Sequence, residues 1–175
     1  MKKGLLFAIT MCAVAVKAGA QGIELTVNGE YEKKEVVTVD SVSASVLYDR
    51  AMEALSDWNG SDGRSKAGLD YHERDAGTVI YKGSYFIDGN KRMYVTANFT
   101  LKVRCKDGRA QVTVTIPSIT AKAIKVTMEK TVTLADAVKN PKRGAYEYLP
   151  KIPIATINLI AAMRDKLRTA VDDDF

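Results

Sequence analysis

The chain has 175 residues, of which 26 are basic and 21 acidic, and its formal net charge is +5. Three of the basic residues (Lys2, Lys3 and Lys17) lie in the first 20 residues, so the rest of the chain carries 23 basic and 21 acidic residues. Such a small excess does not provide the concentrated basic surface of a nucleic-acid-binding protein, and we expect no nucleic-acid partner.

The first 20 residues have the pattern of a secretory signal peptide. Lys2 and Lys3 precede an apolar run from Leu5 to Val16, and Ala18-Gly19-Ala20 supplies the small residues of a cleavage site. The run is shorter than the roughly 20 residues of a membrane span, and no second run of this kind follows. We expect cleavage after Ala20 and a protein exported to the periplasm or the cell surface. An uncleaved N-terminal helix is the alternative.

The two cysteines indicate neither a lipid anchor nor a disulfide. Cys12 follows Met11 inside the apolar run, whereas a lipid-modified cysteine normally follows a small residue at the end of such a run. Cys105 is the only cysteine after cleavage, so no internal disulfide can form. We interpret Cys105 as a small core residue on a strand.

Residues 21–175 are predicted to form a single domain, which is of ordinary size for one hydrophobic core. A strand is expected over 35–40, and a helix over 44–58 because apolar residues recur there every three or four positions after the N-cap candidates Ser41, Ser43 and Ser45. Four β segments follow over 69–74, 78–87, 93–105 and 110–116, and a further strand over 124–134. A long helix begins near Pro153 and runs over about 153–171. Its buried stripe is predicted to be Ile154, Ile157, Ile160, Ala161, Met163, Leu167 and Val171.

The segment 93–105 alternates between apolar and polar residues with a period of two. Its apolar set is Val95, Ala97, Phe99, Leu101, Val103 and Cys105. Its polar set is Tyr94, Thr96, Asn98, Thr100, Lys102 and Arg104. This pattern predicts an antiparallel sheet with one face covered by helices and one polar face. Asp107-Gly108 predicts a hairpin to the next strand.

Three motifs resemble the domain-of-unknown-function family 4468. They are Leu47-Tyr48-Asp49-Arg50-Ala51 leading to Trp58, the spaced residues Tyr71, Glu73, Gly77 and Gly83, and Leu101-Lys102-Val103 through Asp107-Gly108-Arg109. The resemblance covers 36–119 and implies a fold similar to half of the TATA-box-binding protein (TBP), an α+β fold with a curved antiparallel sheet and helices on one face, in β-α-β(4)-α order. It also implies an exported protein of Bacteroides-like bacteria. The family brings no activity, so no functional residue is transferred.

The densest polar cluster is Asp70-Tyr71-His72-Glu73-Arg74-Asp75. On a regular strand Asp70, His72 and Arg74 share one face, and residues two apart can converge on a metal ion. His72 is the only histidine of the chain, however, and zinc needs three or four ligands. We interpret the cluster as a solvated hairpin face and expect no metal and no cofactor.

A nucleophilic enzyme is not expected either. No serine lies in a G-x-S-x-G context, and His72 would have to be the base for any serine or cysteine nucleophile.

The expected function is therefore binding. The polar set on 93–105, with Gln111, Thr113 and Thr115 beside it, offers a platform for an envelope protein or a cell-surface polymer. Threonines stand where the DNA-binding relatives of this fold carry apolar wedges. The alternative is a carrier of a small apolar ligand, with a cavity between the sheet and the C-terminal helix. A plain solvated sheet face also stays open.

Overall fold

The computed structural model describes residues 16–17, 23–55, 63–125, 127–142 and 144–169. Most of the expected signal segment and cleavage site, Trp58 at the end of the first predicted helix, and residues 170–175 lie outside these ranges. Val16–Lys17 forms a two-residue strand, β1, which pairs antiparallel with β2 at Glu24–Leu25.

A six-stranded antiparallel sheet forms the main body, in the order β3-β7-β6-β5-β4. Its strands are β3 (Tyr31–Thr38), β4 (Lys66–Glu73), β5 (Thr78–Gly89), β6 (Met93–Lys106), β7 (Arg109–Ala123) and β8 (Glu129–Thr133). β3 pairs with the first half of β7, and β8 pairs with its second half. The helices are α1 (Ala44–Glu53), α2 (Leu134–Lys139), the 3₁₀ helix η1 (Tyr146–Lys151) and α3 (Ile152–Arg168).

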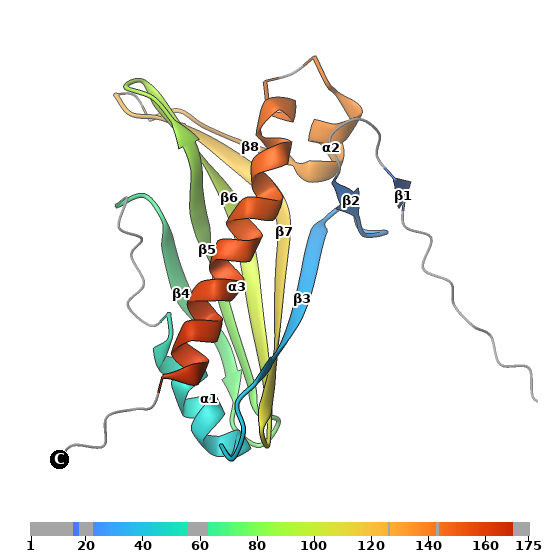
Figure 1. Ribbon diagram of the computed structural model, residues 1–175. Helices are drawn as coiled ribbons and strands as arrows, with labels where there is room; N and C mark the ends of the chain where they lie inside the picture. The colour runs from blue at the N-terminus through green and yellow to red at the C-terminus, as the bar shows by residue number, and fades with distance from the viewer. Residues whose placement is uncertain (1–15, 18–22, 56–62, 126, 143, 170–175) are drawn as a thin grey trace, which may run out of the picture.

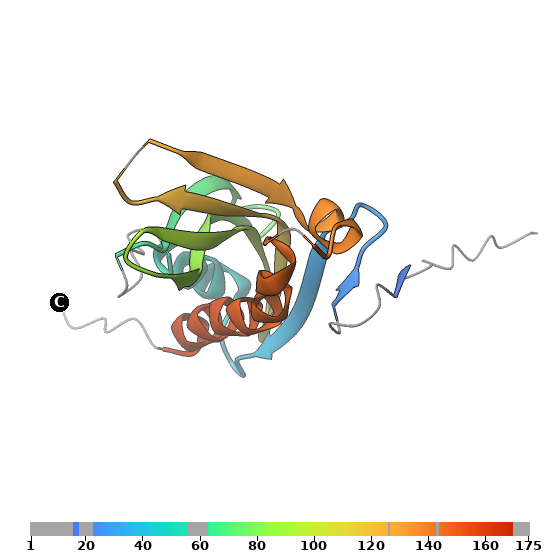
Figure 2. The same ribbon diagram turned by 90° about the horizontal axis from the view of Figure 1, so that it is seen from above.

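Helices α1 and α3 lie on the same side of this sheet (Figure 1), and the view from above shows the sheet curling around them (Figure 2). Helix α1 begins where Ser43 accepts a hydrogen bond from the backbone N–H of Val46 at 3.4 Å, as an N-cap residue does. The β6–β7 hairpin completes this end, because the Asp107 carboxylate accepts a hydrogen bond from the backbone N–H of Ala44 at 2.8 Å. The predicted architecture is confirmed.

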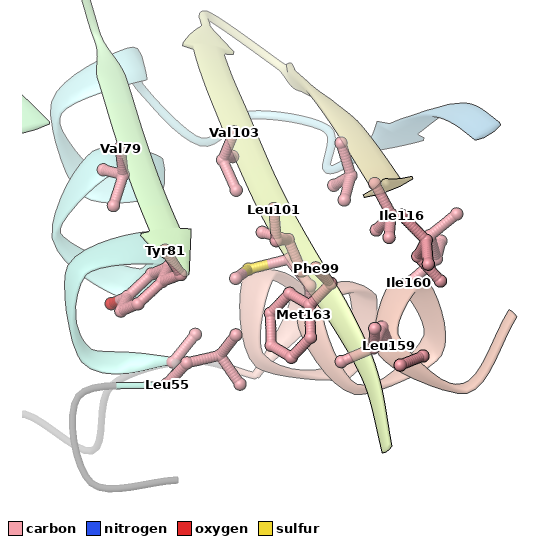
Figure 3. Packing of buried hydrophobic residues seen from close by; sticks show 14 of the residues in the cluster. Leu55, Val79, Tyr81, Phe99, Leu101, Val103, Ile116, Leu159, Ile160 and Met163 are labelled. Atoms are coloured by element: carbon pink, nitrogen blue, oxygen red, sulfur yellow. The ribbon is translucent and has the colours of Figure 1, made fainter. Parts of the chain in front are cut away.

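The core lies between the sheet and the two helices (Figure 3). Its members from β6 are all six residues of the predicted apolar set, from Val95 to Cys105. Tyr81 on β5 is fully buried, and its hydroxyl donates to the carbonyl oxygens of Ala51 and Met52 near the end of α1, at 2.9 and 2.5 Å. The sheet and α1 are thus joined by apolar packing and by one satisfied polar group.

The strand β7 is longer than predicted because its alternation changes phase. Ile116 is buried, but so is Ile119, three residues later. A register shift against β6 lies here, between Asn98 and Thr100 on the partner strand, and Pro117 falls at the phase change. A bulge inserts one extra residue into a strand, and it is one of the places where a sheet tolerates proline. The strand therefore continues past the end of the regular alternation at Ile116 and reaches Ala123.

The last third of the chain departs most from prediction. Among the described residues of the predicted strand over 124–134, only Glu129–Thr133 forms a strand, and Leu134 begins the unpredicted helix α2. The predicted stripe of α3 is wrong in its first half, since Ile154 and Ile157 are 60% and 49% exposed, whereas Ile160, Met163 and Leu167 are buried as predicted. Val171 lies outside the described residues. The residues that α3 buries are Ile152, Ala155, Thr156, Leu159, Ile160, Met163 and Leu167. The sequence hides this stripe because it contains Thr156, whose hydroxyl donates to the carbonyl of Ile152 at 2.9 Å.

The two stripes of α3 should respond differently to truncation. Leu159→Ala, at a position only 1% exposed, should lower the free energy of unfolding by about 3 kcal/mol, because it removes buried methyl groups and leaves a cavity. Ile157→Ala on the same helix should change it by less than about 0.5 kcal/mol. Urea unfolding followed by circular dichroism measures both. Equal losses would show that the buried face of α3 is assigned incorrectly.

Cys105 should make the fold sensitive to alkaline pH. Burial raises the pKa of its thiol from 9.0 to about 11, as expected for a core residue. Between pH 9 and pH 11 the unfolded chain therefore loses this proton while the folded chain keeps it. The corresponding stability is present below pH 9 and is lost as pH rises through this window.

The test is the pH dependence of urea unfolding in the wild-type chain and in Cys105→Ala. The wild-type free energy of unfolding should fall more steeply from pH 9 to pH 11 than that of the variant. Tyr81, whose pKa is raised by burial to about 12, contributes equally to both chains. Identical slopes would contradict the burial of the thiol.

Candidate functional site

The outer face, defined as the side of the sheet away from α1 and α3, carries the predicted polar set of β6. No described helix lies on this side (Figures 1 and 2). The six residues do not form one uniform platform, however. The structure divides them into a neutral half near β8 and a basic half near the β6–β7 hairpin.

The neutral half is held together by hydrogen bonds between side chains. Asn98 on β6 donates through Nδ2 to Ser118 Oγ at 2.9 Å and to Thr120 Oγ1 at 2.8 Å, both on β7. Thr120 also shares a hydrogen bond of 2.9 Å with Thr131 on β8. These bonds tie three strands together, so they occupy polar groups that a partner would otherwise bind.

Thr96 does not belong to an exposed surface, which corrects the prediction for this residue. It is only 2% exposed, and its hydroxyl has no hydrogen-bond partner among the described residues. Its cross-strand neighbours are Phe86 on β5 and Thr120 on β7. Arg64 lies over two aromatic rings beside Thr96: its guanidinium carbon is 5.0 Å from the centre of the Phe86 ring and 5.4 Å from the centre of the Tyr94 ring. Tyr94 is thus part of a cation–π arrangement.

The basic half contains Lys102 and Arg104 from the predicted set. Lys106 at the end of β6 and Arg109 at the start of β7 extend it. All four are exposed, and none makes an ion pair with a residue that the structure describes. Lys82 on the same face differs from these four residues because its ammonium forms an ion pair with the Asp70 carboxylate at 3.1 Å.

A hollow of about 260 Å³ lies within this basic half. It is lined by Val36, Arg104, Lys106, Arg109 and Gln111. Alternation along 93–105 and 110–116 predicted Arg104 and Gln111 on this face, whereas Lys106 and Arg109 were not predicted there. Extending the alternation of β6 through the hairpin would have found both.

The polar cluster around His72 is split by a β-bulge between Leu69 and Tyr71. Asp70 pairs with Lys82 on the outer face, whereas His72 is turned toward α1, where its Nδ1 lies 3.0 Å from the Tyr48 hydroxyl. Asp70 and His72 therefore do not share a face, because the bulge changes the alternation that predicted it.

Arg74 lies on the same side as His72 and pairs with Asp49 of α1. Its guanidinium carbon is 4.8 Å from the centre of the Tyr48 ring. The hydrogen bond that the Arg74 guanidinium donates to the Asp49 carboxylate raises the pKa of this already cationic side chain. These contacts dock β4 onto α1, a role that the sequence did not indicate.

A larger hollow, of about 670 Å³, lies on the helical side of the sheet. Its walls come from β6, β7, β8, α2 and the start of η1. The carrier alternative placed a cavity between the sheet and the C-terminal helix. No residue of α3 lines this hollow, so that placement is corrected.

Within the described residues, no group of three or more His, Cys, Asp or Glu side chains is arranged to hold a metal ion. None of the described helices combines the length and apolar character needed to cross a membrane.

Solved structures of low sequence identity share the fold. A TBP-like protein from Parabacteroides distasonis aligns with a TM-score of 0.56 and 15% identity, over 82% of this chain and 96% of that one. A DUF4468 family protein from Bacteroides ovatus aligns with the same TM-score and identity, over 92% of this chain and 96% of that one. No curated protein matches the chain.

The family comparison covers α1 and the sheet except β8. Residues 34–120 match the family described as "Domain of unknown function (DUF4468) with TBP-like fold", and this range runs from within β3 to near the end of β7. The chain therefore belongs to the DUF4468 family, whose domain with a TBP-like fold it carries over residues 34–120.

Proposed function

We propose that the chain is an exported, non-catalytic envelope protein that binds another envelope protein or a cell-surface polymer through the outer face of its sheet. The observation that carries this proposal is the basic half of that face. Lys102, Arg104, Lys106 and Arg109 are exposed there without a described carboxylate partner, on a side of the sheet that no described helix covers.

Electrostatics indicate the chemistry of the partner. Each uncompensated cation keeps its attraction for an anion, and four on one surface produce a potential that steers acidic partners. The hollow between Arg104, Lys106 and Arg109 gives an acidic group a place to approach more than one cation. Val36, 56% exposed at its wall, adds a small apolar contact. An acidic polymer or an acidic protein surface fits this combination.

Binding rather than catalysis is supported by the only cluster with a histidine. A general base must be free to approach a substrate, and a positioned nucleophile must lie beside it. His72 instead contacts the Tyr48 hydroxyl, next to an ion pair that fastens β4 to α1. Cys105 is buried with a raised thiol pKa and is no candidate nucleophile.

Export is supported by the sequence of the first 20 residues. A basic start, an apolar run and the small residues before Gln21 fit a cleaved signal. A domain with a single remaining cysteine also folds without forming a disulfide in an oxidising compartment.

The basic half should be required for the partner. In cells, the wild-type chain crosslinked chemically should yield one dominant adduct with an envelope component, identified by mass spectrometry. Thr100→Glu combined with Lys102→Glu should reduce this adduct at least tenfold, because it places two carboxylates among the remaining cations.

The matched control is Lys166→Glu with Thr169→Glu, which makes the same charge change at the exposed end of α3. Circular dichroism should show both double variants folded. The control should retain the adduct. If the outer-face variant retains it as well, the partner does not bind at this surface.

A further inference from the structure

The hollow of about 670 Å³ on the helical side of the sheet has the size and composition of a small-molecule site. Ligand pockets usually measure about 300–1,000 Å³ and are mainly apolar with a few polar groups. The floor here is aliphatic and consists of two cross-strand rows. Val95 faces Ala121, and Ile119 faces Val132. This position is independent of the outer face, so the inference goes beyond the proposed binding of a macromolecular partner.

The hollow exists because its walls use small residues. Ala121 lies at the centre of the floor, and Ala137 of α2 and Ala145 before η1 form the opposite wall. Elsewhere on the same side of the sheet, Leu159 and Met163 of α3 fill the corresponding space. Alanine leaves a gap where a larger side chain would complete the core.

The walls are fixed in place by polar contacts at both ends. Thr133 caps α2 by accepting a hydrogen bond from the backbone N–H of Asp136 at 3.1 Å. Lys151 at the end of η1 pairs with Asp88 of β5 at 2.5 Å, and this contact lowers the pKa of the Asp88 carboxyl. The hollow is thus held between two anchored segments, which reduces the ordering that a ligand would have to impose.

Three charged side chains line the hollow, the carboxylates of Asp136 and Glu147 and the ammonium of Lys130. The Asp136 carboxylate accepts a hydrogen bond from the Thr133 hydroxyl at 2.8 Å, at the N-terminus of α2. Burial, and then a hydrogen bond to the Glu147 carboxylate, raise the pKa of the Tyr148 hydroxyl to about 12. Lys130, which faces Ala121 across the β7–β8 pair, makes no ion pair with any residue in the described part of the chain. Lys130 is therefore the one cation among the lining residues, and its ammonium can pair with an acidic group of a ligand, while the two carboxylates keep their charge and bond to hydroxyls.

We propose that this hollow binds a single linear aliphatic chain with an acidic head group, such as a fatty acid. The carboxylate lies at the Lys130 ammonium, and the chain lies over Val95, Ala121 and Val132. An aliphatic floor without hydrogen-bonding side chains favours an occupant whose interior carries no polar atoms, because an unpaired polar atom would be desolvated without compensation.

Chain length is the first readout. Each buried methylene strengthens binding about fourfold, so dodecanoate should bind roughly 15-fold more tightly than decanoate. Isothermal titration calorimetry on the full chain, with both acids kept below their micelle concentrations, measures this ratio. Dodecanoate that produces no saturable binding, or the same affinity for both acids, would overturn the proposal.

The head group is tested by Lys130→Gln. It should weaken dodecanoate binding about fivefold, in line with the loss of one partly exposed ion pair, and leave binding of dodecanol unchanged. Lys139→Gln is the matched control, because Lys139 is an exposed lysine of α2 that does not line the hollow. Equal weakening by the two variants would exclude a specific site for the carboxylate.

The location is tested by filling the hollow from both walls. Ala121→Phe on the floor and Ala145→Leu on the opposite wall should each weaken both dodecanoate and dodecanol at least tenfold. Thermal unfolding identifies a variant that fails to fold, and the two positions lie on different segments, so one folded variant is enough. The Thr100→Glu and Lys102→Glu double variant should bind dodecanoate normally. Unchanged binding in a folded filling variant would place the ligand elsewhere.

Discussion

The burial of one side of an antiparallel sheet under α1 and α3 is the interaction on which the whole molecule depends. Fully burying a large aliphatic side chain contributes about 1.5–3 kcal/mol, and the alternating residues of β6 supply several such side chains on one side only. Because the side-chain period of a strand is two, every residue between them must point the other way. The same constraint that builds the core therefore produces the polar outer face, without requiring that this face be selected for binding.

Register shifts then divide the sheet into two regions. β5 has an extra residue between Phe86 and Asp88, and β7 has one around Pro117, opposite the β6 segment between Asn98 and Thr100. Bulges bend the strands and increase the local twist, and the sheet curls as Figure 2 shows. Helix α3 packs on one region, whereas α2 and η1 approach the region around β8. The larger hollow lies in this second region, where the covering segments carry alanines instead of the leucines and methionine of α3.

Regular alternation and helix capping made most of the sheet and α1 predictable from the sequence. Particular residues show which features local patterns predict and which they do not. The apolar set of β6 and the Ser43 cap follow from local patterns. The separation of Asp70 from His72 and the burial of Thr96 do not, since both depend on neighbouring strands and on bulges that leave no periodic signal. The buried stripe of α3 was hard to recognise in the sequence because it contains a polar residue. Thr156 can lie in the core because its hydroxyl donates a hydrogen bond to the Ile152 carbonyl of the same helix.

The net charge of the chain did not predict the basic half of the outer face. Basic and acidic residues can be nearly equal in number while the basic ones gather on one surface. Lys102, Arg104 and Lys106 alternate with buried residues on β6, so strand geometry places successive cations about 7 Å apart on one side. At that distance in water two unit charges repel by only about 0.6 kcal/mol. The hydrophobic burial of Val103 and Cys105 between them outweighs this cost, and the fold tolerates the cluster. An acidic partner that approached this side of the sheet would be attracted by all of these cations at once. The pattern that stabilises the core thus concentrates positive charge at the surface, where it is available for recognition.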